Sequence, residues 1–126
     1  MKKLIALLLV VVLAASAFCL EAFAVNFPSD FDEGTVNGKH WIARLTSNEE
    51  TASSKLNWNG YGSVRVNMRG NYFDGWDQYK SFYSSSTGNG TPATYTVANP
   101  LIQYIWEVSS TCKIQGRVVS TLSTHY

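Results

Sequence analysis

The sequence predicts an all-β protein, a small antiparallel β-sandwich of immunoglobulin-like or jelly-roll size with six to eight strands. Three observations support this prediction. Apolar and polar residues alternate in short segments, turn signals separate these segments at intervals of roughly ten residues, and strong helical periodicity is absent after residue 24. Two paired cysteines around a tryptophan, the immunoglobulin pattern, are missing, so the strand order and a small closed barrel stay open as alternatives.

The first 24 residues have the layout of a cleaved signal peptide. Two lysines precede an apolar run from Leu4 to Ala15, and small residues end the segment at residue 24. We expect residues 1–24 to be removed, which predicts a secreted, extracellular protein without stable membrane insertion; a retained N-terminal anchor is the alternative. The short signal led by lysines is typical of bacteria, and attachment to the cell surface stays open.

Charge and cysteine content argue against nucleic-acid binding and against a reactive thiol. The chain has 10 Lys and Arg and 9 Asp and Glu residues, and loss of Lys2, Lys3 and Glu21 would leave a formally neutral domain. Such a domain has no broad basic field for phosphates, so nucleic acid is not an expected partner. Cys112 would then have no second cysteine to pair with. Because it alternates in register with Ile114, we expect its thiol to be buried and unreactive.

The sandwich domain is expected over residues 39–126. Residues 25–38 predict an irregular leader with at most one short edge strand, since they combine a proline, two glycines and three acids. Residues 48–54, NEETASS, predict a polar connection. The segment between them, HWIARLTS, predicts a half-buried strand whose inner face carries Trp41, Ala43 and Leu45.

The segment KLNWNGYGSVRVNMRG, residues 55–70, predicts two strands joined by a tight β-hairpin. Asn59-Gly60 can supply the positive φ angles that such a turn needs. Alternation assigns an inner face to both strands, made of Leu56, Trp58, Val64, Val66 and Met68.

Strands are also expected in the last third of the chain, after a polar loop over residues 84–93. The segments TYTVA, LIQYIWEVS and CKIQGRVVSTLSTHY alternate in the same way, with Gly116 as a bulge or bend. In the second of them, one face would hold Ile102, Tyr104, Trp106 and Val108. We expect the tryptophans of alternating strands to lie in the core: Trp41, Trp58 and Trp106.

The segment YFDGWDQYKSFY, residues 72–83, packs six aromatic rings into twelve residues. Gly75 and the β-rich surroundings favour a loop over residues 71–78 and a strand over residues 79–84. A loop with charged residues lies partly in solvent, because a buried loop strands its backbone polar groups. The rings therefore either cap the sandwich or form a binding face. The candidate ligand-binding residues are Tyr72, Phe73, Asp74, Trp76, Asp77 and Tyr79.

This mixture of rings and carboxylates suits a carbohydrate-binding face. Sugar C–H faces pack on aromatic planes, and Trp and Tyr offer a large contact area at low entropic cost. We expect a secreted, non-catalytic protein that binds a polysaccharide or cell-wall polymer. One alternative is a bacteriocin-like or adhesion effector with a protein or lipid-linked target. The other is a self-assembling matrix component that pairs through a sheet edge in residues 109–126.

Catalytic and metal motifs of recognised spacing are absent from the sequence. His40 and His125 lie far apart along the chain, and together with Cys112 they match no nucleophile or zinc arrangement. The acids at residues 30–33, 74 and 77 match no calcium loop. We therefore expect no enzymatic activity, no cofactor and no metal, and the sequence leaves the oligomeric state open.

Overall fold

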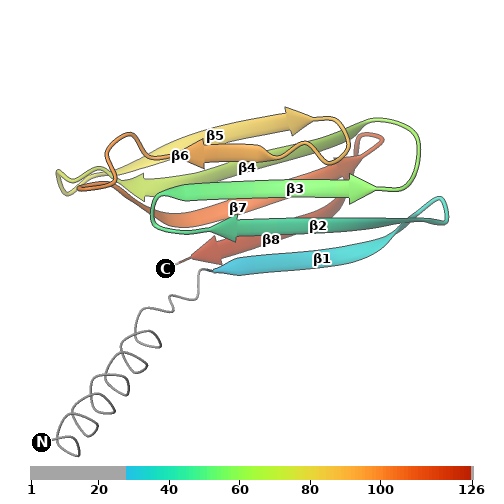
Figure 1. The fold of residues 1–126 in the computed structure, drawn as a ribbon, viewed down its shortest axis with the longest axis horizontal. Coiled ribbons are helices and arrows are strands. Elements are labelled where there is room, and N and C mark those ends of the chain that lie inside the picture. Colours follow the sequence, from blue (N-terminus) through green and yellow to red (C-terminus); the bar gives the residue numbers. More distant parts are fainter. Residues whose placement is uncertain (1–27, 126) are drawn as a thin grey trace, which may run out of the picture.

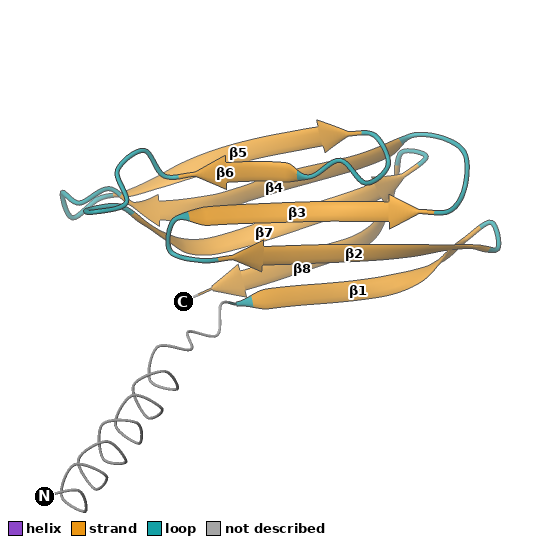
Figure 2. Ribbon diagram, in the orientation of Figure 1, coloured by secondary structure: helices purple, strands orange, loops and turns teal. Residues whose placement is uncertain are grey.

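β-strands make up the regular structure of the described chain. The computed structural model describes residues 28–125, which form eight strands and no helix (Figure 1) (Figure 2). The strands form two four-stranded sheets with antiparallel neighbours, and Figure 1 shows one sheet lying over the other. The prediction of an antiparallel β-sandwich is confirmed. The expected signal peptide lies outside the described residues.

Each sheet combines strands that are not all consecutive in the sequence. The first sheet has the order β1-β2-β3-β6, formed by Ser29–Val36, Lys39–Ser47, Thr51–Trp58 and Ala93–Thr96. The second has the order β5-β4-β7-β8, formed by Tyr79–Thr87, Val64–Phe73, Tyr104–Ile114 and Arg117–His125.

Two tight hairpins join neighbouring strands within the sheets. Asn37 and Gly38, with φ angles of 53° and 70°, connect β1 to β2, and Gln115 and Gly116, with φ angles of 50° and 76°, connect β7 to β8. Positive φ at both central residues matches the twist of paired strands, as in a type I′ turn. The stretch predicted as an irregular leader thus contains an eight-residue edge strand, β1, which pairs along its whole length with β2.

The hairpin predicted at Asn59-Gly60 is wrong. β3 pairs with β2 and β6, whereas β4 pairs with β5 and β7, so residues 59–63 cross from one sheet to the other. Gly60 serves a close approach, because a Cβ there would lie 2.2 Å from a ring carbon of Trp58. The backbone N–H of Asn59 donates to the carbonyl of His40 at 3.0 Å, which extends the pairing of β3 with β2 past the end of the strand.

The polar connection predicted over residues 48–54 is shorter than expected, because β3 begins at Thr51. Ala52 and Ser54 point into the interior. The Ser54 hydroxyl lies 2.6 Å from the Ser110 hydroxyl of the opposite sheet, and this buried hydrogen bond satisfies two polar groups that would be costly to leave unpaired.

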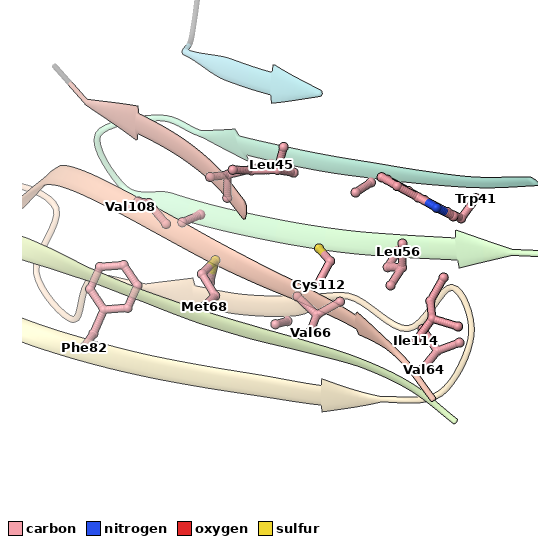
Figure 3. Close-up of a cluster of buried hydrophobic side chains, with 14 of the residues drawn as sticks. Trp41, Leu45, Leu56, Val64, Val66, Met68, Phe82, Val108, Cys112 and Ile114 are labelled. Atoms are coloured by element: carbon pink, nitrogen blue, oxygen red, sulfur yellow. The ribbon is translucent and has the colours of Figure 1, made fainter. Parts of the chain in front are cut away.

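The core lies between the two sheets, filled by the inward faces of the strands (Figure 3). The predicted inner faces of β2, β3 and β4 are confirmed, as is the burial of Trp41, Trp58 and Cys112. Burial raises the pKa of the Cys112 thiol, which keeps the thiol in its protonated, unreactive form.

The prediction that Trp106 is a core residue is wrong. The register between β4 and β7 passes from Asn71–Glu107 to Tyr72–Ile105 and so skips Trp106, which marks a β-bulge. Ile105 and Val108 therefore point inward, whereas the Trp106 side chain remains 41% exposed. Ile102 is also exposed and Tyr104 is only partly buried, so the inner face predicted for this segment holds only for Val108.

The two open sides of the sandwich are closed by different means. At one side β1 lies beside β8 (Figure 1), and the carboxylates of Asp30 and Asp32 accept hydrogen bonds from the Ser123 N–H at 2.9 Å and the Ser120 hydroxyl at 2.7 Å. At the other side β6 lies beside β5, where the rings of Phe82 and Tyr95 stack with centroids 4.0 Å apart.

Candidate functional site

An aromatic row crosses three neighbouring strands of the second sheet. Phe73 at the end of β4 is in register with Tyr79 at the start of β5 and with Tyr104 at the start of β7. The ring centroid of Phe73 lies 5.8 Å from that of Tyr79 and 5.1 Å from that of Tyr104. Residues that are directly opposite share one face of a sheet. Since Tyr72 and Ile105, the sequence neighbours of Phe73 and Tyr104, face the core, this row faces outward.

Trp106 joins the row from the bulge in β7. Its ring meets that of Tyr79 edge to face, with centroids 6.4 Å apart and planes at 60°. We call Phe73, Tyr79, Tyr104 and Trp106 the aromatic patch. Tyr79 is 60% exposed and Trp106 is 41% exposed, whereas Phe73 and Tyr104 are partly buried. The patch therefore presents two rings to solvent, and contacts among all four rings hold them in place. Such contacts fix ring positions before any ligand arrives.

The loop between β4 and β5 stands next to the aromatic patch. Gly75 and Asp77 have φ angles of 83° and 56°, and the Asp74 N–H donates to the Gln78 carbonyl at 2.9 Å, which makes the loop tight. The Trp76 side chain at its tip is 77% exposed, and Asp77 is exposed beside it.

Asp74 is largely buried and holds this loop in place. Its carboxylate forms an ion pair with Lys80 at 2.7 Å and accepts a hydrogen bond from Gln103 Nε2 at 3.1 Å. The hydrogen bond from Lys80 holds the Asp74 pKa below its ordinary value, against the opposing effect of desolvation, and Gln103 adds to the lowering. Because its carboxylate oxygens bind Lys80 and Gln103, we assign Asp74 the role of holding the loop in position.

The structure separates the predicted site residues into two groups. Phe73, Trp76, Asp77 and Tyr79 lie on or next to the exposed patch. Tyr72 faces the interior, where its ring packs against Tyr95 with centroids 5.8 Å apart, and Asp74 serves the loop. Sequence reasoning missed Tyr104 and Trp106, because alternation placed both on the inner face and no local signal marks the bulge.

A groove with several polar side chains in its lining adjoins the aromatic patch on the second sheet, and we call it the polar groove. It has a volume of about 350 Å³ and runs over all four strands, with Arg69, Asn71, Ser81, Glu107 and His125 among its lining residues. The Asn71 Nδ2 donates to Glu107 Oε1 at 2.5 Å, which orients both groups at the groove surface. Asn71 is two positions before Phe73 along β4 and points to the same face, so the groove begins where the patch ends.

Two further features are absent from the residues that the structure describes. Within residues 28–125, no three His, Cys, Asp or Glu side chains are arranged to hold a metal ion. The same stretch contains no helix long and apolar enough to cross a membrane.

These features define a small antiparallel β-sandwich with an aromatic patch and a polar groove on one sheet. Comparisons of the chain with protein-family models, with curated protein sequences and with solved structures give no match. Its function therefore has to be inferred from the geometry of the candidate site.

Proposed function

We propose that this is a secreted, non-catalytic protein that binds a glycan or cell-envelope polymer on the outward face of β5, β4, β7 and β8. The observation that carries the proposal is the aromatic patch, in which four rings from three adjacent strands pack side by side on the outward face and two of them, Tyr79 and Trp106, are exposed. Clustered exposed rings of this kind mark interaction sites on soluble proteins. Rings fixed on a sheet suit the flat C–H faces of sugars.

The polar groove supplies the complementary chemistry. Hydroxyl groups of a sugar both donate and accept hydrogen bonds, and the groove offers the amide and carboxylate of Asn71 and Glu107 beside the hydroxyls of Ser81 and Ser109. A polymer that stacks on Tyr79 and Trp106 would place its next units over this groove.

The test compares exposed aromatic residues at two places on the surface, the patch and a distant loop. Trp106→Ala and Tyr79→Ala remove rings of the patch, whereas Tyr61→Ala removes a ring that is 96% exposed in the loop between β3 and β4. Titration calorimetry against soluble plant and cell-wall polysaccharides should show affinity about tenfold weaker for each patch variant and unchanged for Tyr61→Ala. Equal affinity in all three variants, or no binding by the parent protein, would contradict the proposal.

A second candidate function is an effector with a lipid-linked target. Its support is an apolar tip formed by two adjoining loops: Gly75 packs against Ile102, Leu101 is 93% exposed, and Trp76 projects from the same end. Such residues can enter a membrane interface. Co-sedimentation with lipid vesicles that is lost in Leu101→Ser would favour this function over glycan binding.

Self-assembly through the edge of the second sheet has less support. Asp30 accepts the hydrogen bond from the Ser123 N–H of edge strand β8, so the neighbouring sheet occupies part of that edge.

A further inference from the structure

We propose that the ligand is an anionic polysaccharide and that Arg65, Arg69 and Lys113 bind its carboxylate groups. This inference rests on the proposed function and adds the chemical class of the polymer. The three cations lie on the outward face that carries the aromatic patch, since they occupy the strand positions that alternate with buried residues of β4 and β7.

Two of these cations are directly opposite each other. Arg65 of β4 is in register with Lys113 of β7, and like charges placed opposite on a sheet destabilise it. The ion pairs found among the described residues join His40 to Glu33 and Lys80 to Asp74, so neither member of this opposed pair takes part in one. A bound anion would relieve the repulsion.

The distribution of acids leaves this face positive. Within strands β4, β5, β7 and β8, Glu107 is the one acidic residue, and it lies at the patch end, bonded to Asn71. The other described acids lie on β1, in the loop after β2 and in the loop before β5. A domain with balanced charges thus has a basic surface on one sheet, which is complementary to an anionic chain.

The Arg65 guanidinium is oriented in advance by its neighbours. Its Nε donates to Asn67 Oδ1 at 3.1 Å, and the same oxygen accepts a hydrogen bond from the Tyr83 hydroxyl at 2.9 Å. The two Nη nitrogens carry the remaining donors of the guanidinium, and their planar arrangement matches a carboxylate. Arg65, Lys113 and Thr87 line a hollow of about 320 Å³, which gives a carboxylate room to enter.

The patch and the cations lie along one line. β4 carries Phe73 at one end and Arg65 at the other, a distance of roughly 26 Å for eight residues of extended strand. Arg69 and the polar groove lie between them. An extended polymer along this line would stack sugar rings on the patch and bring its carboxylates to Arg69, Arg65 and Lys113. A sugar acid combines both features in one repeating unit.

The experiment compares each of two acidic polymers with its uncharged form. Polygalacturonate and alginate are titrated into the purified protein by calorimetry, beside their methyl-esterified forms, which keep the sugar rings and lose the charge. We expect an acidic polymer to bind, its esterified form to bind about tenfold more weakly or worse, and affinity for the acid to fall as salt is raised because salt screens exposed charges.

Matched variants assign the effect to the face. Arg65→Gln with Lys113→Gln removes the opposed pair, while Arg44→Gln with Lys55→Gln removes an equally charged opposed pair from the first sheet. Only the first double variant should lose affinity for the acidic polymer. The salt dependence of binding by the parent protein tests the contribution of charge without any variant.

The possible failures are distinguishable. Equal binding of acidic and esterified polymers, with Arg65→Gln/Lys113→Gln as tight as the parent and Trp106→Ala weakened, would overturn this inference and leave the proposed function standing. Preference for a phosphate polymer such as teichoic acid over every carboxylated one would also overturn it. Binding to no glycan at all would overturn both.

Discussion

Tyr79 of β5 and Trp106 of β7 meet edge to face with ring centroids 6.4 Å apart, although β4 separates their strands. The contact exists because the bulge in β7 turns Trp106 outward, toward the row that Tyr79 begins. One irregular residue thus moves the largest side chain of this strand from the core to the surface. The same step adds a fourth ring to the aromatic patch.

The first prediction concerns how stability depends on the two kinds of tryptophan. Trp58 is buried in the core, whereas Trp106 is 41% exposed. Trp58→Ala should lower the free energy of unfolding by about 3 to 5 kcal/mol, because it leaves a large cavity. Trp106→Ala should lower it by about 1 kcal/mol or less. Urea denaturation followed by circular dichroism measures both, and similar losses in the two variants would place Trp106 in the core after all.

The second prediction concerns the hydroxyl pair that joins the two sheets. Ser54→Ala leaves the buried Ser110 hydroxyl with only a weak contact to Cys112 Sγ at 4.0 Å, and this should cost about 1 to 3 kcal/mol of unfolding free energy. Ser54→Ala with Ser110→Ala removes both polar groups, so it should cost less than the sum of the single changes. A double-mutant cycle by denaturant titration measures the sign of the interaction free energy between the two hydroxyls. Strict additivity would mean that the hydroxyls do not interact.

Local patterns predict the faces of the strands better than the partners of those strands. Alternation placed Trp41, Ala43 and Leu45 correctly, because burial of one face depends on the period of the strand alone. The dipeptide Asn-Gly occurs at residues 37–38, 59–60 and 89–90, yet only the first makes a hairpin. An Asn-Gly turn permits tight pairing, but which strands pair depends on contacts between distant segments.

The candidate site was predicted only in part for the same reason. Trp76 lies in a loop whose charged residues already indicated exposure, and it is exposed, whereas Tyr72 of the same stretch faces the interior. The exposure of Trp106 depends on a bulge that is defined by the pairing of β7 with β4. The groove and the opposed cations depend on the register between neighbouring strands of the sheet. These features belong to pairs of strands, so a single strand carries no sign of them.

The third prediction concerns the response of the loop at Trp76 to acid. The Lys80 hydrogen bond holds the pKa of Asp74 below its unfolded value. The stabilisation is therefore complete above the unfolded-state pKa of about 3.9, and it is lost as the pH falls through the lower folded pKa. Asp74→Asn should remove this loss of stability at low pH. It should also loosen the loop at neutral pH, as seen by Trp76 fluorescence quenching. Asp77→Asn, which changes an exposed acid outside the ion pair, should leave the pH profile as it is.

The fourth prediction concerns Gly70, in the middle of the sheet beneath the polar groove. A Cβ at this position would lie 2.3 Å from the Glu107 carbonyl oxygen and 2.6 Å from the nearest carbon of the Phe82 ring. The backbone contact cannot relax by a rotamer change, and moving Phe82 would disturb its stack on Tyr95, which closes one side of the sandwich. Gly70→Ala should therefore lower the free energy of unfolding by about 1 to 3 kcal/mol through overpacking, although alanine generally favours folding over glycine. Thermal denaturation of Gly70→Ala measures the loss. An unchanged or higher melting temperature would show that β4 and β7 are not packed as closely at this point as the structure places them.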